Sequence, residues 1–255
     1  IKRTLLIESE HHLSIKNEQL ILLNKESGEI KSVCLDDVGF IVLDNIATTY
    51  TGYLFSFLAQ KNIAVCFCDK NHTPSTMLLN LNSNTTQAQT FIAQAEMKDT
   101  LKNKLWKQTI QQKIQNQANF LKFIGKNDTA LRRFVKTVKT GDSTNREAQA
   151  SKYYWNELFT GMNFTRERYG DPPNNLLNYG YAVIRAVMAR AIAGSGLHPT
   201  LGIKHSNKYN AFCLADDLME PYRVYVDDIV MKYIEYSKSL EITKESHTKI
   251  TYSRL

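Results

Sequence analysis

The chain has 255 residues, of which 43% are hydrophobic, enough for one large domain or two smaller ones, each with a core. No apolar run reaches about 18 residues, which predicts no membrane span. The apolar stretch after the first basic pair is too short for a secretory signal, and this favours a cytoplasmic protein. The four cysteines (Cys34, Cys66, Cys68 and Cys213) lack the spacing of a disulfide framework or a zinc site, which predicts buried free thiols.

The net charge of +7 is concentrated in residues 96–140, where eleven basic side chains stand against three acidic ones. Lys and Arg contacts to phosphate supply most non-specific affinity for nucleic acid, so this segment indicates nucleic-acid binding. A solvated helix surface would have the same composition, and composition does not separate the two. The basic residues are Lys98, Lys102, Lys104, Lys107, Lys113, Lys122, Lys126, Arg132, Arg133, Lys136 and Lys139.

Short apolar runs separated by turn residues predict β-strands in the first part of the chain. The expected strands are residues 4–8, 12–16, 19–23, 30–35, 39–43 and 63–68, with one helix over residues 49–60. The run at 39–43 is wholly apolar, which indicates a buried strand. Residues 1–80 are therefore predicted to form an antiparallel β domain.

After a polar linker at residues 81–90, the composition becomes rich in Gln, Lys, Ala and Leu, which favours helix. Helices are expected over 87–125, 129–138, 144–159, 174–193 and 222–240. Residues 91–255 are predicted to form a larger all-α domain, so the fold class is α+β with more than one domain.

The signatures of P-loop, Rossmann, α/β-hydrolase and zincin proteins are absent from the sequence, which leaves a dispersed set of acids and a histidine. Glu147 is the first candidate. Thr144 and Glu147 have the spacing of a capping box, in which the glutamate caps its own helix, and this is the structural alternative to a catalytic role.

His205 follows a connection shaped by glycine and proline, and a neutral imidazole is a common metal ligand. A hydrogen-bonded structural histidine is the alternative. His198 competes less well for the ligand role because it lies in the turn itself.

Glu220 and Asp217 are separated by three residues, so a helix would place both on one face, where they could share a cation. A salt-bridge network with Arg223 is the alternative. A mixed histidine and carboxylate site in a basic protein favours Mg²⁺ or Mn²⁺ with open positions for phosphate oxygens.

The order and surroundings of these residues resemble one family. REA at 146–148 followed by Tyr154, LNYGYA at 177–182, GLHPTLGIKH at 196–205 and DLMEPYR at 217–223 are similar to the motif series of the CRISPR adaptation integrases, the Cas1 family. The resemblance implies a β domain before a helical domain, with a metal held by Glu147, His205 and Glu220. Many members have Asp at the last position, which leaves open whether Asp217 shares the metal.

The resemblance also implies a mechanism and partners. A prespacer duplex with 3′-hydroxyl ends would attack the CRISPR repeat, in an assembly of homodimers, formed through the β domain, around a Cas2 dimer. Lys152, Lys204 and Arg223 would bind DNA phosphates, and Tyr153, Tyr154 and Trp155 either stack on bases or pack in the core. The DLMEPYR segment is similar to the type II subtype, which implies an RNA-guided effector nuclease as a further partner.

Two alternatives remain open at this stage. A non-catalytic basic DNA-binding protein would use Glu147 as a cap, His205 structurally and Glu220 in an ion pair with Arg223. A plain metal-dependent nuclease would cut DNA without joining it.

Overall fold

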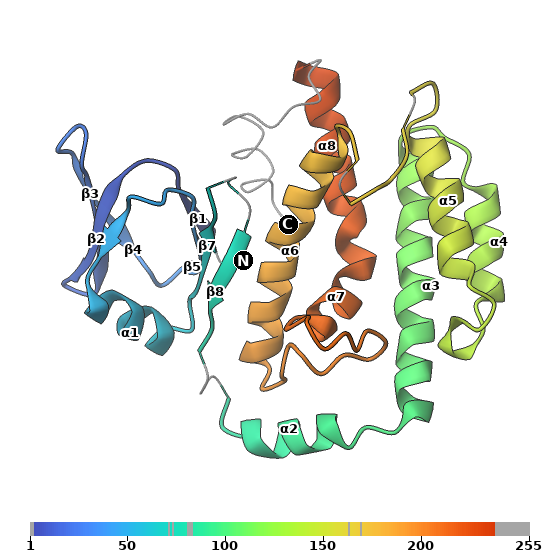
Figure 1. Ribbon diagram of the computed structural model, residues 1–255, viewed down its shortest axis with the longest axis horizontal. Helices are drawn as coiled ribbons and strands as arrows, with labels where there is room; N and C mark the ends of the chain where they lie inside the picture. Colours follow the sequence, from blue (N-terminus) through green and yellow to red (C-terminus); the bar gives the residue numbers. More distant parts are fainter. Residues whose placement is uncertain are drawn as a thin grey trace. The chain divides into compact units, whose positions relative to one another are not determined.

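The computed structural model describes residues 3–70, 72, 74–80, 84–162, 164–168 and 170–237. The chain divides into two compact units (Figure 1). One is Ile1–Ala88 with Arg190–Leu197, and the other is Gln89–Ala189 with His198–Leu255. The predicted fold class, a part built of strands followed by a helical part, is confirmed. The role of the first part in dimerisation and the expected linker stay predictions.

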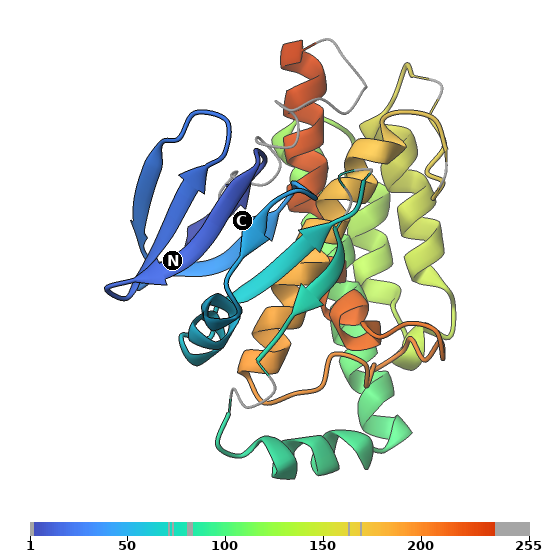
Figure 2. The ribbon, with the colours of Figure 1, turned by 60° about the vertical axis from the view of Figure 1, so that its left-hand side comes forward.

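Two four-stranded sheets form the body of the first unit (Figure 2). The first sheet has the strand order β1-β5-β7-β8, and the second has the order β4-β3-β2-β6. The strands are β1 (Arg3–Ile7), β2 (His11–Lys16), β3 (Gln19–Asn24), β4 (Ile30–Cys34), β5 (Val38–Leu43), β6 (Thr49–Tyr50), β7 (Ala64–Cys68) and β8 (Pro74–Leu78).

The strand directions correct the expectation of an antiparallel domain. β1 and β7 both pair with β5 in parallel, and β8 adds to β7 antiparallel. In the second sheet β2, β3 and β4 are antiparallel, while β6 joins β2 in parallel. All residues of β5 are buried, as expected of a parallel strand covered on both faces. Its apolar run predicts burial, but the direction of its partners depends on connections remote in sequence.

The helix expected over residues 49–60 is confirmed as α1 (Gly52–Gln60), whose residues Leu54, Phe57 and Leu58 are buried. They join a core that includes Ile41 of β5 and Val65 of β7. This core is formed by the first unit alone.

All four cysteines are free thiols, as predicted, but one is not buried. Cys66, Cys68 and Cys213 are buried, whereas Cys34 is exposed. Cys34 ends β4, which lies at the edge of its sheet, so one side of that strand has no neighbouring strand to cover it.

The helical part contains more and shorter helices than the sequence pattern predicts. The helix expected over 87–125 is two helices, and the one expected over 222–240 starts one residue later, with its last three residues outside the described part of the chain. The helices are α2 (Gln87–Ala95), α3 (Asp99–Phe123), α4 (Thr129–Thr137), η1 (Thr140–Asp142), α5 (Arg146–Leu158), α6 (Asn174–Gly194), α7 (Cys213–Met219), η2 (Glu220–Tyr222) and α8 (Arg223–Ser237).

The long helix α3 runs through the second unit and contacts α4, α5, α7, η2 and α8 (Figure 1). Trp106, Ile110 and Ile114 lie on its buried stripe with the spacing of one helix face. Two polar residues, Lys113 and Gln117, lie on the same stripe and are also buried. α3 therefore carries a lysine into the interior.

A buried carboxylate in α8 links that helix to α5 and α6. Asp227 of α8 is 1% exposed and accepts hydrogen bonds from the hydroxyls of Tyr154 in α5, at 2.8 Å, and Tyr181 in α6. Burial raises the pKa of Asp227 to about 6, although the two hydroxyl donors oppose the shift. The core alternative for Tyr154 is thus correct, whereas Tyr153 is partly exposed and donates to the carbonyl of Asn127.

Among the described residues, no helix combines the length and the apolar character that crossing a bilayer requires.

The raised pKa of Asp227 predicts a stability difference that depends on pH. The folded protein holds this proton up to about pH 6, whereas an unfolded aspartate loses it near its ordinary pKa of 3.8. The contribution of Asp227 to the free energy of unfolding therefore falls as pH rises from about 4 to about 6, by roughly 3 kcal/mol at most. Asp227→Asn cannot titrate, so the variant should gain stability relative to wild type across this window.

Urea unfolding of wild type and variant at several pH values between 4 and 7 measures this difference. Asp228→Asn is the matched control, because it removes the neighbouring carboxylate, which is partly exposed and paired with Lys232. A constant difference between wild type and Asp227→Asn across the window would contradict the prediction.

Candidate active site

The ammonium group of Lys113 lies between two of the predicted carboxylates. Its Nζ is 2.8 Å from Glu147 Oε1 and 2.6 Å from Glu220 Oε2. The side chains of Lys113 and Glu220 are only 9% and 6% exposed. Glu147, in the first turn of α5, and Glu220, in η2, are thereby brought to one point on α3.

The charges in this cluster stabilise one another against burial. Burial alone would lower the pKa of Lys113, but the charges of Glu220 and Glu147 more than offset this and raise it. Burial would likewise raise the pKa of Glu220, but Lys113 and Arg223 hold it down at about 2. Lys113 and Glu220 are therefore both charged at neutral pH, and each stabilises the charge of the other.

Arg223 is the second cation on Glu220. Its Nε and Nη2 lie 3.0 Å and 2.9 Å from Glu220 Oε1, and its guanidinium stacks on the ring of Tyr181 at 4.6 Å. The ion pair that the non-catalytic alternative requires is thus present. Arg223 is occupied by Glu220, so its contact with DNA phosphate stays a prediction.

Glu147 is positioned by a cap that the sequence pattern does not identify. The carboxylate of Asp142 accepts hydrogen bonds from the backbone N–H of Arg146 at 2.8 Å and of Glu147 at 3.0 Å. Thr144 does not cap the helix with its side chain, so the capping box is not formed. Because Asp142 satisfies these amides, the side chain of Glu147 is free to reach Lys113.

Glu220 is positioned by the short turn that separates α7 from α8. Pro221 follows it in η2, which fixes the backbone at that point. Asn116 of α3 donates from Nδ2 to the carbonyl of Pro221 at 2.7 Å. α3 therefore holds both the side chain of Glu220, through Lys113, and the backbone beside it.

His205 is oriented by Asp217 rather than by the glutamates. Its Nδ1 lies 2.5 Å from Asp217 Oδ1, and the ring meets Trp106 of α3 edge-on at 5.8 Å. The hydrogen bond to Asp217 raises the pKa of His205 despite its partial burial. With Nδ1 bonded to the carboxylate, Nε2 is the nitrogen left for a ligand, as in carboxylate–histidine–metal arrangements.

Both carboxylate oxygens of Asp217 accept hydrogen bonds from the loop that carries His205. Asp217 is fully buried, and its Oδ2 accepts the backbone N–H groups of Ile203 at 2.6 Å and Lys204 at 2.8 Å. Its other oxygen accepts from His205. Asp217 thereby orients the loop that carries His205. Whether Asp217 also shares a cation with Glu220 stays a prediction.

Gly202 allows this loop to close tightly. A Cβ there would collide with the carbonyl oxygen of His205 and lie 2.9 Å from Cys213 Cβ and 3.0 Å from Asp217 Oδ2. Only a residue without a side chain permits so close an approach of the backbone to Asp217.

The donor atoms fit a divalent cation in part. Glu220 Oε2 is buried and accepts no hydrogen bond of normal geometry, although the ammonium of Lys113 lies beside it. That oxygen and Glu147 Oε1 already share one cationic group, and carboxylate oxygens are ligands that Mg²⁺ and Mn²⁺ accept. Within the described part of the chain, however, no three His, Cys, Asp or Glu residues lie close enough to bind one metal ion. The three-residue metal site stays a prediction.

The remaining residues predicted for DNA binding are on the surface. Lys152 of α5 and Lys204 are both exposed, so both can reach a phosphate. His198 lies apart from the cluster: its backbone N–H donates to the side chain of Gln94, and its ring packs against Phe91 of α2.

Comparison with known proteins assigns the chain to a family. A family model described as "CRISPR associated protein Cas1" matches residues 5–250. A CRISPR-associated endonuclease Cas1 from Neisseria meningitidis is 36% identical over 239 residues, which are 92% of this chain and 77% of the relative. This chain belongs to the Cas1 family. A second Cas1, from Francisella tularensis subsp. novicida, is 28% identical and aligns over 89% of this chain and 80% of its own length.

Solved structures share the fold at lower identity. A casposase bound to integration product superposes with a TM-score of 0.82 at 21% identity, covering 98% of this chain and 80% of that chain. A Cas1 protein from Thermotoga maritima gives 0.73 at 20% identity, covering 95% and 81%. A partial Cas6-RT-Cas1–Cas2 complex gives 0.63 at 18% identity, covering 96% and 79%.

Lys113 is the site residue that the sequence analysis missed, since it was counted with the basic surface. A signal for it exists. Trp106, Ile110 and Ile114 define a buried stripe, and position 113 falls on that stripe rather than on the polar face. A lysine at such a position requires buried carboxylates as partners.

Removing Lys113 is expected to destabilise the protein. Lys113→Met leaves Glu147 and Glu220 near each other without the cation between them, and breaking a buried ion pair in this way costs about 3–5 kcal/mol. Urea unfolding in EDTA measures the loss, and added Mn²⁺ should restore part of it. Lys104→Met, at an exposed position of the same helix, is the control. Equal stability of the two variants in EDTA would show that the cluster does not support the fold.

Adding one methyl group at Gly202 should disturb His205. Gly202→Ala forces the loop away from Asp217 and is expected to lower the free energy of unfolding by about 1–3 kcal/mol, as overpacking does. Gly52→Ala is the control, because a Cβ at the start of α1 meets nothing within 4 Å. Thermal unfolding of both variants tests this, and a Gly202→Ala protein as stable as Gly52→Ala would argue against the close approach.

Proposed function

We propose that this chain is a metal-dependent DNA integrase and endonuclease of CRISPR adaptation, which joins prespacer DNA to a repeat by 3′-hydroxyl attack. The observation that carries the proposal is the convergence of Glu147 and Glu220 on one cationic group within a basic helical unit. Membership of the Cas1 family supports the same chemistry, as does the likeness of the fold to a casposase bound to integration product.

Glu147, Glu220 and His205 would hold Mg²⁺ or Mn²⁺. Such a metal, when bound, activates a hydroxyl or water and stabilises the leaving oxygen of a phosphodiester. The chain's own residues supply the positioning. Asp217 holds the Nδ1 side of His205, which presents Nε2, and Arg223 keeps Glu220 ionised within the buried cluster.

Lys113 has a role of its own in this proposal. Its ammonium keeps the two carboxylates together, so that the positions of their oxygens are set by the fold. Preorganised charges of this kind lower the reorganisation that a reaction would otherwise require. Lys152 and Lys204, both exposed, would bind phosphates of the DNA.

The proposed partners are DNA, a second copy of this chain and a Cas2 dimer. Support comes from two solved structures of similar fold, a casposase bound to integration product and a partial Cas6-RT-Cas1–Cas2 complex. The type II subtype, the effector nuclease as a partner and the cytoplasmic location also stay predictions.

Two observations favour the non-catalytic alternative. Glu220 is paired with both Lys113 and Arg223, and the bond between His205 and Asp217 would equally suit a structural histidine. Under that alternative DNA binding would be indifferent to metal, and no DNA would be joined. A plain nuclease would relax plasmid DNA without forming branched products.

The strand-transfer reaction separates the three functions. We expect wild type, with the Cas2 partner and Mn²⁺, to join a short duplex bearing 3′-hydroxyls to a plasmid carrying the repeat, and EDTA to abolish joining. His205→Ala and Glu147→Gln should each lower joining by about a hundredfold or more, and Asp217→Asn by about ten- to a hundredfold.

His198→Ala is the matched control, because it removes the other histidine of the same connection and should leave joining intact. Relaxed plasmid without branched product would favour the nuclease. Joining by His205→Ala at the wild-type rate would remove His205 from the site.

A further inference from the structure

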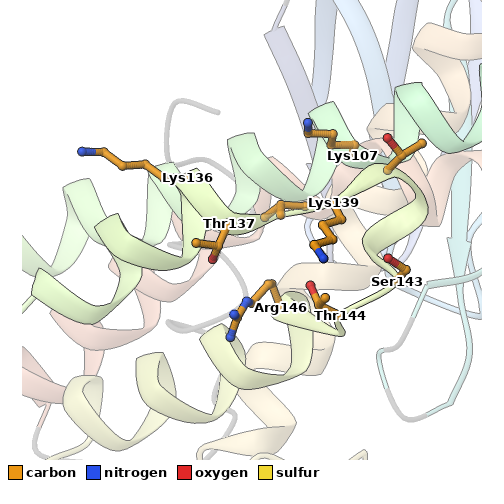
Figure 3. A pocket seen from close by; sticks show the side chains of 9 residues that line it. Lys107, Lys136, Thr137, Lys139, Ser143, Thr144 and Arg146 are labelled. Atoms are coloured by element: carbon orange, nitrogen blue, oxygen red, sulfur yellow. The ribbon is translucent and has the colours of Figure 1, made fainter.

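A basic cavity of about 710 Å³ lies beside the carboxylate cluster, where α3, the end of α4, η1 and the start of α5 meet (Figure 3). Four cationic side chains line it, Lys107, Lys136, Lys139 and Arg146, together with hydroxyl side chains that include Ser143 and Thr144. No acidic side chain lines it. The cavity therefore has the lining expected of a site for an anion with several oxygens.

Two polar atoms of this lining have no hydrogen-bond partner among the described residues, whereas Nη1 of Arg146 donates to Gln149 Oε1 at 2.6 Å. Within the described part of the chain, none of the four cations forms an ion pair with a carboxylate. Arg146 Nε and Thr144 Oγ1 are buried atoms that have no hydrogen-bond partner. In Figure 3 the Lys139 ammonium extends toward Thr144 and Arg146. Buried polar atoms are nearly always satisfied, so these two indicate a missing partner.

The carboxylate of Asp142 does not line the cavity. Asp142 of η1 uses both oxygens on the backbone N–H groups of Arg146 and Glu147. The N-terminus of α5 is therefore already capped, and the anion site is formed by side chains.

The position of the cavity identifies its ligand. Arg146 immediately precedes Glu147, and Lys107 lies on α3 six residues before Lys113, which is about 9 Å along a helix axis. Successive phosphates of one strand in duplex DNA are about 3.4 Å apart along the helix axis. A separation of about 9 Å between the cavity and the carboxylate cluster therefore corresponds to a few nucleotides.

We propose that this cavity binds a backbone phosphate of the DNA strand whose nearby phosphodiester reacts at Glu147 and Glu220. The bound phosphate fixes the register of the strand, because the cations of the cavity lie at a set distance from the carboxylates. This inference rests on the proposed function for the identity of the reacting strand, whereas DNA binding by the cavity can be measured without catalysis.

The test combines charge removal in the protein with charge removal in the DNA. A short duplex with 3′ single-stranded ends is prepared as a set in which one phosphate at a time is replaced by a neutral methylphosphonate. Binding of each duplex is measured in EDTA for wild type and for two double variants. The cavity variant carries Lys136→Gln and Lys139→Gln, and the control variant carries Lys98→Gln and Lys122→Gln. All four of these lysines are exposed, and each double variant loses the same charge.

We expect one methylphosphonate position, a few nucleotides from the joining site, to weaken binding by wild type and by the control variant by about tenfold. The cavity variant should be insensitive at that position, because its phosphate contact is already lost. Its salt dependence should also fall, by about 0.7–0.9 in the slope of log K against log salt for each lost contact.

Equal loss of affinity in both double variants, with the same methylphosphonate profile as wild type, would overturn the cavity proposal. The joining assay run in parallel distinguishes this from failure of the proposed function. Position-specific binding without any joining would leave the cavity in place and overturn the integrase. Joining by the cavity variant at the same rate as the control variant would support the integrase and overturn the cavity proposal.

Discussion

The ammonium of Lys113 and the carboxylate of Glu220 are buried together, and the partly exposed Glu147 is the second carboxylate on that ammonium. The helical unit is arranged around this cluster. Lys113 lies on the interior stripe of α3, Glu147 comes from the start of α5, and Glu220 comes from the turn before α8. Each charge alone would cost several kcal/mol in this environment, which is offset only when all are in place. The relative positions of α3, α5 and η2 are therefore fixed by electrostatics as well as by packing, and with them the positions of the two glutamates.

His205 is held by a separate set of contacts. Asp217 gathers the backbone amides of the loop and the imidazole, Gly202 lets that loop approach closely, and Trp106 supports the ring. The glutamates depend on Lys113, whereas the histidine depends on Asp217. Both sets meet α3, because Trp106 and Lys113 belong to the same helix. α3 thus contacts the imidazole of His205 through Trp106 and the two glutamates through Lys113.

Local pattern in the sequence is sufficient to predict most of the helices. The resemblance of four motifs singles out Glu147, Glu220 and His205, and their catalytic role stays a proposal. The sequence did not predict the direction of β1 and β7 beside β5, since strand pairing is settled by residues remote in the chain. The cap of α5 was also assigned wrongly. Both Thr144 and Asp142 are capping residue types, and the choice depends on the left-handed backbone at Asp142 and Asn145, which composition does not reveal. Helical spacing placed Asp217 beside Glu220, but it did not predict the hydrogen bonds that Asp217 accepts from backbone amides.

In the basic segment at residues 96–140, the number of basic side chains in the sequence exceeds the number that a ligand can contact. Lys113 is consumed by the carboxylates, Lys126 donates to the carbonyls of Glu157 and Leu158 at the end of α5, and Arg132 pairs with Asp128. Among the described residues, the lysines of the cavity, Lys107, Lys136 and Lys139, have no such partner. Lys107 and Lys113 illustrate the division on one helix: the first lines an open cavity, and the second faces the buried stripe. Two side chains six residues apart on a helix point to different faces. Lys107 is therefore placed to bind a ligand, whereas Lys113 holds the two glutamates in position.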